Sequence, residues 1–233
     1  MRSCLVRPIT YWVVKAEDPK ELVRRGYDLL SERYEQEFAA DGKYQSWIAE
    51  LCERLPAQAA VLDIGCGCGI PVARDLSDAG HRLTGIDISE VQIRRARVLV
   101  PGAAFMHGDV TTVEFAPASF DAVVAMYTLI HIPLEQQRLL LERIAAWLRP
   151  GGWFLGTMGH LAWTGTDSDW LGSGVAMWWS HADAATNRDW ITRSGLIVQA
   201  EEFVPEGDSG HVLFWATSPD DGTESPASPH QTG

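Results

Sequence analysis

From about residue 56 to residue 217, short apolar runs alternate with stretches in which apolar residues recur every three or four positions. The short runs are bounded by Gly, Pro or Asp and predict strands, whereas the longer spacing predicts amphipathic helices. The predicted strands are residues 60–65, 81–87, 104–107, 120–127 and 153–157. The predicted helices between them are residues 71–78, 90–100 and 134–148. This alternation predicts a doubly wound α/β fold, in which right-handed crossovers place helices on both faces of a parallel sheet.

The end of this region has a different pattern, typical of a helix followed by a hairpin. Residues 183–193 have helical spacing, and Gly195 after them is typical of a helix that ends in a left-handed residue. Residues 196–204 and 211–217 predict two strands joined by a turn-rich segment. We therefore expect an antiparallel hairpin at the edge of the sheet.

We predict one domain with helices before it and a tail after it. Residues 1–55 contain two helical stretches separated at Asp41-Gly42, and we expect them to form a lid within the same domain. Residues 56–217 form the core, with a tryptophan-rich lid insertion at about 161–181. Residues 218–233 have no apolar side chain beyond one Ala and predict a disordered tail.

Composition narrows the classes of function. The 233 residues include 19 Lys and Arg against 31 Asp and Glu, giving a net charge of −12, so a nucleic-acid partner is not expected. No apolar run approaches the roughly 18 residues that span a membrane, so a membrane partner is not expected either. The four cysteines lack paired CxxC motifs, which predicts reduced thiols and no metal site. The N-terminus lacks the apolar segment of a secretory signal, and we expect a cytoplasmic protein.

A glycine-rich loop follows the first predicted strand and predicts a binding site. In residues 63–69, DIGCGCG, glycines allow a tight turn and the close approach of a ligand, and the next helix offers free N–H groups. The following strand ends in Asp87-Ile88, 18 residues after Gly69, where a carboxylate can accept hydrogen bonds from both hydroxyls of a ribose. The combination predicts a site for a ribonucleoside.

NAD, FAD and S-adenosylmethionine all contain a ribose, and three features favour the last. The loop has the spacing GxGxG rather than GxGxxG. Asp63 lies just before the loop, where a carboxylate repels a pyrophosphate but attracts an ammonium or a sulfonium. Asp109-Val110 follows the third strand, in position for the carboxylate to meet the exocyclic amine of adenine.

In their order, these motifs resemble those of class I S-adenosylmethionine-dependent methyltransferases of the small-molecule type. The matching segments are residues 61–69, 85–89, 108–110, 119–133 and 148–157. The resemblance implies a Rossmann-like, seven-stranded and mostly parallel sheet, whose last strand is antiparallel. It also implies that Gly65, Gly67 and Gly69 lie against the methionine moiety, that Asp87 holds the ribose, and that Asp109 holds the adenine amine. Ile88 and Val110 would then border the nucleoside.

The resemblance implies transfer of the methyl group of S-adenosylmethionine to a small-molecule acceptor by in-line displacement, leaving S-adenosylhomocysteine. A secondary metabolite is the expected kind of acceptor. One alternative is a protein of the same fold that binds S-adenosylmethionine but transfers no methyl group. The other is a nicotinamide-dependent oxidoreductase, which should show GxGxxG and catalytic partners that we do not find. The acceptor atom and the oligomeric state stay open.

Histidine is the side chain best suited to accept a proton from the acceptor at neutral pH. Three histidines follow strands or lie in the segment expected above the sheet: His131, His160 and His181. Each is also an ordinary loop residue by pattern alone. A base is not essential, because the electrophile is already activated and placing the nucleophile supplies much of the acceleration.

Aromatic residues predict the walls of the site. Tyr27 and Tyr34 lie seven apart on one helical face, as either lid residues over the sulfonium or a core stripe. Trp170, Trp178 and Trp179 are either an aromatic wall for the acceptor or a structural seam. The two adjacent tryptophans cannot point the same way in an extended segment, so we expect one of them in the core.

Overall fold

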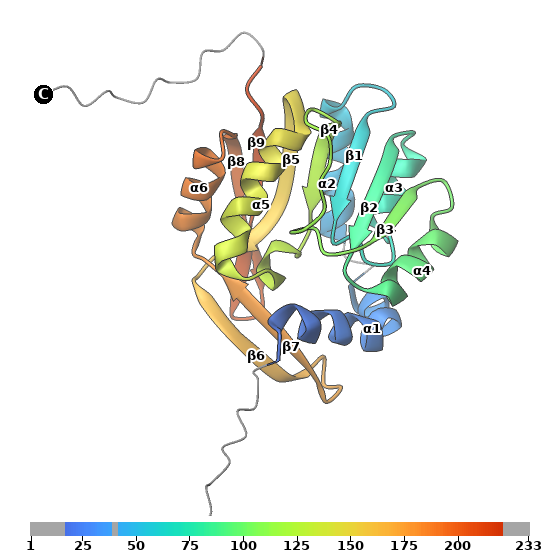
Figure 1. Cartoon of the computed structure of the whole chain (residues 1–233), viewed down its shortest axis with the longest axis vertical. Helices are drawn as coiled ribbons and strands as arrows, with labels where there is room; N and C mark the ends of the chain where they lie inside the picture. Colours follow the sequence, from blue (N-terminus) through green and yellow to red (C-terminus); the bar gives the residue numbers. More distant parts are fainter. Residues whose placement is uncertain (1–16, 39–41, 221–233) are drawn as a thin grey trace, which may run out of the picture.

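The computed structural model describes residues 17–38 and 42–220, and its centre is a seven-stranded sheet (Figure 1). The strands are β1 (Ala60–Ile64), β2 (Arg82–Asp87), β3 (Ala104–His107), β4 (Phe120–Ala125), β5 (Leu148–Gly159), β8 (Ile197–Glu206) and β9 (Ser209–Thr217). Their order is β3-β2-β1-β4-β5-β9-β8, and all neighbours are parallel except β9, which is antiparallel to both β5 and β8. The predicted fold is confirmed.

Helices cover both faces of this sheet, as right-handed crossovers require. The helices of the first face are α2 (Gly42–Arg54), α3 (Val72–Asp78) and α4 (Glu90–Leu99). Those of the second face are α5 (Leu134–Trp147) and α6 (Ala184–Arg193). Alternate residues of one strand enter the two cores: Val61 of β1 packs with the first set and Leu62 with the second. Asp63, next in line, therefore points to the first face.

Local signals predicted the helix ends well. The Ser89 side chain caps α4, because its Oγ accepts a hydrogen bond from the backbone N–H of Gln92 at 3.1 Å. The reciprocal bond of a capping box is replaced, since Oε1 of Gln92 accepts from Ser31 instead. Gly195 has a φ of +95° and follows α6, as expected of a left-handed helix stop.

A second, two-stranded sheet lies beyond the carboxyl ends of the parallel strands. It consists of β6 (Trp163–Trp170) and β7 (Val175–His181), which the sequence predicted only as a lid insertion. In Figure 1 this hairpin lies beside α1 (Pro19–Phe38), at the same edge of the molecule. A buried cluster of Val23, Trp170 and Met177 joins the two. Gly26 allows the close approach, since a Cβ there would lie 2.6 Å from Cε of Met177.

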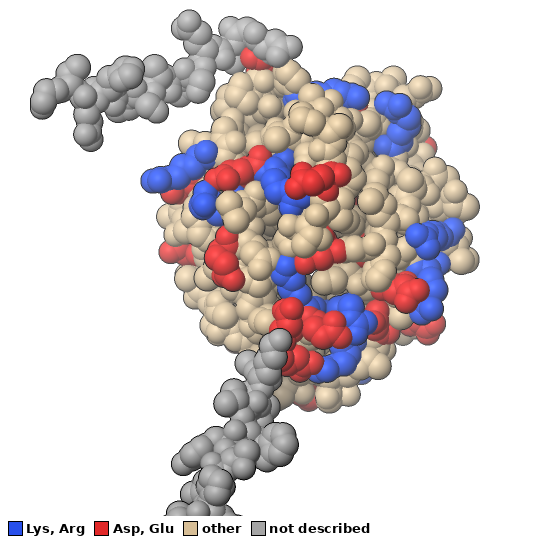
Figure 2. Space-filling model, in the orientation of Figure 1, with Lys and Arg blue, Asp and Glu red and all other residues tan. Residues whose placement is uncertain are grey.

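The surface and the end of the chain complete the fold. Figure 2 shows acidic and basic side chains gathered over the lower edge, where α1 lies in Figure 1. The predicted tail begins with three described residues, and Ser218 donates its N–H to the carbonyl of Gly152 at 2.8 Å. The rest of that tail lies outside the described residues. Among the residues described, no helix has the length and apolar character needed to cross a bilayer.

Candidate active site

Three adjoining cavities lie at the carboxyl edge of the sheet, beneath α1 and the β6–β7 hairpin. We call the first the nucleoside cavity, which Gly67, Asp87 and Asp109 help to line and whose volume is about 90 Å³. The loop cavity, of about 60 Å³, lies against the glycine loop and Asp63. The aromatic cavity, of about 130 Å³, lies between α1 and the hairpin and includes Trp170. Tyr34 borders all three, so the cavities are neighbours within one site.

The glycine loop has the conformations that its sequence predicted. Gly65 has a φ of +68°, and a Cβ there would lie 2.1 Å from Oγ1 of Thr128. That hydroxyl donates to the carbonyl of Ile64 at 2.8 Å and joins the loop to the end of β4. Gly67 has a φ of +55°, and a Cβ there would project into open space with Gln92 Nε2 as its nearest neighbour at 3.9 Å. Gly67 therefore leaves the floor of the site open to a ligand.

Gly69, the third predicted cofactor glycine, lies at the turn into α3. It lines none of the three cavities, and a Cβ there would lie 3.1 Å from Val100 and 3.4 Å from Phe105. Its φ of +83° and its N–H bond to the carbonyl of Cys66 at 2.9 Å complete the turn into α3. Gly69 thus packs the loop against the core.

Asp87 lies at the end of β2, where the sequence placed a ribose ligand. Its Oδ2 accepts the N–H of Gly67 at 2.9 Å, and its Oδ1 accepts the N–H of Ser89 at 2.8 Å. Burial raises the pKa of this carboxyl to about 6, although the two backbone bonds lower it. A carboxylate has about four acceptor positions, so each oxygen retains one for a ligand hydroxyl. Ile88 lines the same cavity with an apolar side chain.

Asp63 is a buried acid with an unsatisfied oxygen. It is 2% exposed, and its Oδ2 has no hydrogen-bond partner among the residues described. Burial, followed by the charge of Asp87, raises its pKa to about 7. Such a group is unfavourable unless a donor or a cation is placed against it. Its position on the loop cavity makes a cationic ligand the natural partner.

Asp109 is paired more extensively than the sequence predicted. Its Oδ2 accepts from Nζ of Lys20 at 2.7 Å, and its Oδ1 accepts both the N–H and the hydroxyl of Thr111. Burial raises the pKa of Asp109, but the bonds from Lys20 and Thr111 outweigh it and lower the pKa overall. Lys20 extends from α1, so this ion pair also fastens the lid over the nucleoside cavity, which Val110 helps to line.

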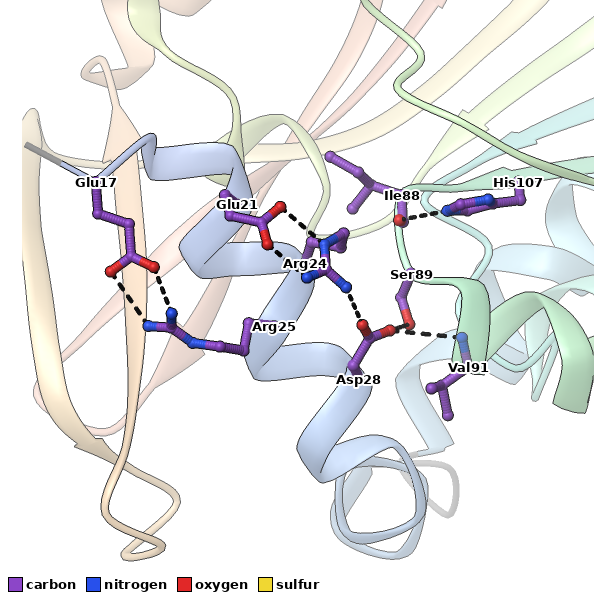
Figure 3. Close-up of polar contacts among 9 residues, drawn as sticks. All are labelled: Glu17, Glu21, Arg24, Arg25, Asp28, Ile88, Ser89, Val91 and His107. Carbon is purple, nitrogen blue, oxygen red and sulfur yellow. Dashed lines mark hydrogen bonds and ion pairs between the residues drawn. The ribbon is translucent and has the colours of Figure 1, made fainter.

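Further polar contacts fasten α1 to the start of α4 (Figure 3). Oδ1 of Asp28 accepts a hydrogen bond from the Ser89 hydroxyl at 2.6 Å, and Arg24 pairs with the other oxygen of the same carboxylate. Ser89 is the residue that caps α4 and follows the strand ending in Asp87. The lid is thus bonded to the very segment that presents the ribose carboxylate.

Tyr27 and Tyr34 extend from α1, the lid helix, and border the cavities rather than packing in the sheet core. Tyr27 borders both the nucleoside and the aromatic cavity, and the centroids of the two tyrosine rings are 5.2 Å apart in an edge-to-face arrangement. Burial raises the pKa of Tyr34 to about 12 and that of Tyr27 well above its ordinary value. Both hydroxyls are therefore neutral at physiological pH.

His131 lies beside Tyr27 with both ring nitrogens bonded. Nδ1 is 2.8 Å from the carbonyl of Trp178, which can only accept, so this nitrogen has the proton. Nε2 then accepts from the Tyr27 hydroxyl at 3.0 Å. Burial lowers the pKa of His131 to about 4, so the ring is neutral at pH 7. The predicted catalytic residue lines the site but serves to join the lid, β7 and the short helix η1 (Leu129–His131).

The other two predicted bases lie outside the three cavities. His160 stacks edge-on against Phe203, with ring centroids 4.7 Å apart. His181 lies at the end of β7, where its Nδ1 is 2.6 Å from the carbonyl of Leu161. Neither histidine borders a cavity that Asp87 or Tyr27 reaches. Both histidines therefore lie near the carboxyl edge of the parallel strands but do not line the three cavities.

The aromatic cavity is lined by two of the three predicted substrate tryptophans, Trp170 and Trp179. The rings around it include Tyr27, Tyr34, Tyr44, Tyr127, Trp170 and Trp179. Trp170 is only 7% exposed, so it also supports the fold. Trp178 does not line the cavity and contributes its backbone carbonyl to His131. The two adjacent tryptophans point to opposite sides of β7, as the strand period requires.

A polar cluster at one end of the aromatic cavity was missed by the sequence analysis. Glu206 ends β8, and its Oε1 accepts from Nζ of Lys43 at 3.0 Å and from the hydroxyl of Tyr127. Its Oε2 lies 3.2 Å from Nδ1 of His211, near the start of β9. Burial raises the pKa of Glu206, but its contacts with His211, Tyr127 and Lys43 outweigh burial and bring the pKa to about 2. Glu206 is therefore ionised.

Tyr127 lines both the nucleoside and the aromatic cavity. It follows β4 with a φ of +54°, a left-handed conformation that is strained for a residue other than glycine. Its N–H donates to the hydroxyl of Thr157, which holds that conformation. This conformation places the phenol ring between the two halves of the site.

Within the described ranges, no group of three or more His, Cys, Asp or Glu could hold a metal ion.

Comparison with known proteins identifies the central region. Residues 61–152, from β1 into β5, match the family described as a methyltransferase domain. These residues form a methyltransferase domain. The methyltransferase domain contains the glycine loop, Asp87, Asp109 and His131, whereas the lid, the β6–β7 hairpin and Glu206 lie outside it.

Relatives of known sequence and structure agree with this assignment. The chain is 36% identical over 111 residues to the O-methyltransferase resE of Aspergillus sclerotiorum, a match that covers 44% of this chain and 41% of that protein. The chain thus spans less than half the length of that curated relative. The structure of 1,6-didemethyltoxoflavin-N1-methyltransferase of Burkholderia thailandensis, with its substrate and S-adenosylhomocysteine bound, has a TM-score of 0.68 at 18% identity, covering 89% of this chain and 93% of that one. The [4+2]-cyclase SpnF has the same fold, with a TM-score of 0.60 at 20% identity over 75% of this chain and 80% of its own.

Proposed function

We propose that the protein binds S-adenosylmethionine and transfers its methyl group to a small-molecule acceptor. The observation that carries this proposal is the arrangement around Asp87: a carboxylate fixed by two backbone N–H groups, next to the open floor at Gly67. The unpaired oxygen of Asp63 lies on the adjoining loop cavity. A ribose, flanked by a cationic amino-acid end, satisfies both features.

The residues present fit this cofactor from end to end. Asp87 would hold the ribose hydroxyls, while Ile88 and Val110 provide apolar walls for the adenine and Asp109 lies at its far end with Lys20. Asp63 would face the ammonium or sulfonium, directly or through water. When bound, the cofactor supplies a methyl group on a positively charged sulfur. The remaining work of the chain is to place the acceptor and to exclude water, which the lid and the aromatic cavity do.

The acceptor belongs on the aromatic side of the site. Tyr27, Tyr34 and Tyr127 border both the nucleoside and the aromatic cavity, so a molecule in the second cavity approaches the cofactor between these rings. A small metabolite fits this cavity, and we include the secondary metabolites that the sequence predicted. Residues of α1 and of the hairpin line the cavity, and its volume of about 130 Å³ favours a small molecule over a polymer.

A binding experiment followed by product analysis tests the proposal. Isothermal titration calorimetry should show binding of S-adenosylhomocysteine and no binding of NADH. Mass spectrometry of reactions with S-adenosylmethionine and a panel of small acceptors should show products heavier by one methylene. Binding of NADH in place of S-adenosylhomocysteine would establish an oxidoreductase instead. Tight S-adenosylhomocysteine binding with a product rearranged but not methylated would favour the other alternative, for which the fold of a [4+2]-cyclase provides a precedent.

A further inference from the structure

The polar end of the aromatic cavity contains a histidine, His211, with a carboxylate beside one ring nitrogen and, among the described residues, no hydrogen-bond partner for the other. Nδ1 of His211 is buried, makes no aligned hydrogen bond with a described residue, and lies 3.2 Å from Oε2 of Glu206. Because a carboxylate only accepts, this contact favours the tautomer with the proton on Nδ1. Nε2 then has a free lone pair, and it forms no hydrogen bond within the described ranges.

We propose that His211 is the general base of the aromatic cavity, positioned by Glu206, and that the acceptor is a hydroxyl group on a single aromatic ring. The proposal rests on the proposed methyl transfer and specifies its substrate class. The hairpin β8–β9 supplies both residues, whereas the methyltransferase domain supplies the cofactor residues. The two halves of the reaction thus come from different segments of the chain.

The size and the walls of the cavity favour a single flat ring. Its volume is about 130 Å³, and a cavity of about 150 Å³ holds one benzene molecule. Tyr127 and Trp179 are among the rings that line it, and aromatic walls bind a planar aromatic ligand by stacked or edge-to-face contacts. A larger acceptor would therefore insert one ring and leave the remainder toward the opening.

The charges around His211 favour a neutral hydroxyl over an anion or a cation. The groups that face it are Glu206 of β8, the Tyr127 phenol after β4 and the His181 ring of β7, whose centroid is 6.1 Å away. Lys43 of α2 reaches the same carboxylate at 3.0 Å. Lysine and glutamate offset each other, so the cavity end has little net charge and one proton-accepting nitrogen.

Proton removal by imidazole matches a phenol better than other nucleophiles. A phenol has a pKa of about 10, within reach of an imidazole base, whereas an aliphatic alcohol is far less acidic. In the transfer, Nε2 of His211 takes the hydroxyl proton as the oxygen forms its bond to the methyl carbon. The carbon–sulfur bond breaks with its electron pair remaining on sulfur, and the imidazolium formed is stabilised by Glu206 until its proton leaves to solvent.

The first arm of the test uses a chromophoric phenol and needs no turnover. We would titrate 4-nitrophenol into the full chain saturated with S-adenosylhomocysteine and record the phenolate absorbance band. In the wild type the bound ligand should ionise at a pH below that needed in free solution. His211→Gln should bind the ligand without this shift, and His181→Gln, the same change at the neighbouring histidine outside the cavity, should behave as the wild type. Glu206→Gln should show a reduced shift.

The second arm measures methyl transfer from S-adenosylmethionine to 4-nitrophenol and to catechol. His211→Gln should lower kcat by about 10²- to 10³-fold with KM changed less than about 3-fold, since the base acts in the transition state. Glu206→Gln should lower kcat less, and Glu206→Asp should restore part of the loss, as expected of a positioning residue. Melting curves and S-adenosylhomocysteine affinity would establish that each variant is folded. If His211→Gln does not fold, the kcat of Glu206→Gln tests the proposal instead.

The outcomes separate the two proposals. If the wild type does not bind S-adenosylhomocysteine, the proposed function fails. If it does bind, the base assignment is overturned by a His211→Gln variant that keeps wild-type kcat, or by an equal loss in His181→Gln. Methylation of 4-nitroaniline or 4-nitrothiophenol in preference to the phenol would overturn the hydroxyl assignment and leave methyl transfer standing. If no phenol binds the protein saturated with S-adenosylhomocysteine, the hydroxyl assignment is likewise overturned and methyl transfer is left standing.

Discussion

The two halves of the site recognise their ligands by opposite means. The nucleoside and loop cavities are built from backbone and acids: glycines with positive φ, the fixed carboxylate of Asp87, and the buried, unpaired Asp63. The aromatic cavity is built from rings contributed by the lid, the loop after β4 and the β6–β7 hairpin. The glycines and acids of the first half lie within residues 61–152, with α1 covering them. The aromatic half draws most of its rings from segments on either side of that region.

The difference teaches where specificity resides. Backbone geometry and fixed charges tolerate little change, because a Cβ at Gly67 or a neutral residue at position 87 alters the binding surface directly. Rings on separate segments can be exchanged for other rings without disturbing the sheet. We therefore expect the cofactor half to be sensitive in affinity and stability, and the aromatic half to be sensitive in the choice of acceptor.

The largest effect should come from the buried charge of Asp63. Its folded pKa of about 7 lies above the ordinary 3.8, so between these values the folded state keeps a proton that the unfolded chain has lost. The free energy of unfolding should therefore fall as pH rises from about 4 to about 7, by about 4 kcal/mol from this group, with Asp87 adding in the same direction. Denaturant unfolding of the ligand-free protein at pH 5 and pH 8 should record about 3 kcal/mol of this fall, since pH 5 already lies above the ordinary value, and Asp63→Asn should remove most of the difference.

Asp121, which lies on β4 beside the first residue of β1, offers the matched control. Its Oδ2 accepts the N–H of Ala60 at 2.7 Å and pairs with Arg149. Burial raises its pKa, but these bonds outweigh burial and lower it overall, so the stability it contributes is present at neutral pH and is lost on acidification. Asp121→Asn should therefore destabilise at pH 7 and leave the fall between pH 5 and pH 8 in place. An unchanged pH slope in Asp63→Asn would contradict the buried charge.

Gly67→Val should abolish cofactor binding. The branched side chain would enter the open floor of the site and would also strain a φ of +55°. We expect the affinity for S-adenosylhomocysteine to fall by more than about 100-fold, corresponding to about 3 kcal/mol. Gly80→Val is the control, because Gly80 has a φ of +87° with nothing within 4 Å and lies after α3, away from the cavities. If both variants bind normally, the loop is not the binding surface.

Asp87→Ala should weaken S-adenosylhomocysteine binding by about 2 kcal/mol, or roughly 30-fold, because two charge-assisted hydrogen bonds to the ribose are lost. The Gly67 N–H also loses its acceptor, so part of the effect comes from a looser loop. Titration with S-adenosylhomocysteine and with its 2′-deoxyribose analogue separates the contributions. The analogue should distinguish wild type from variant less than the parent ligand does; an equal difference for both ligands would argue against ribose recognition.

The smallest effect on the cofactor should come from the aromatic half. Trp179→Ala should leave S-adenosylhomocysteine affinity within about 2-fold and raise the acceptor KM several-fold, because Trp179 lines only the aromatic cavity. Trp178→Ala, at the adjacent position outside that cavity, is the matched control and should leave the acceptor KM unchanged. Melting curves record the stability of each. Equal KM values for the two variants would remove the distinction between the halves.

Most of the sheet and the cofactor half could be predicted because their signals are local. Residues 104–107 form β3 as predicted, and the glycines, Asp63 and Asp87 are fixed by the loop between one strand and the next. The β6–β7 hairpin lacked such a signal, because most of β6 is exposed and its polar residues do not alternate with apolar ones. Its structure depends on Trp170 and Met177 packing against α1, a contact that no local pattern reveals.

The missed residues of the acceptor half have a single geometric cause. The predicted histidines follow parallel strands or lie in the segment expected above the sheet, but β9 runs antiparallel, so its beginning lies at the carboxyl edge of the parallel strands. His211 pairs with Gly159, the last residue of β5, which places it at the site. A hairpin predicted at the sheet edge contained this information, since the strand direction determines which end faces the ligand.

The lid helix α1 has one further consequence, which concerns the thermodynamic coupling of the two ligands. The same helix walls the nucleoside cavity through Lys20 and the aromatic cavity through Tyr27 and Tyr34. When a ligand on one side orders α1, the helix loses its conformational entropy at that step. A second ligand on the other side then binds without that loss. Cofactor and acceptor should therefore bind cooperatively, and by linkage each must raise the affinity of the other by the same factor, whichever arrives first.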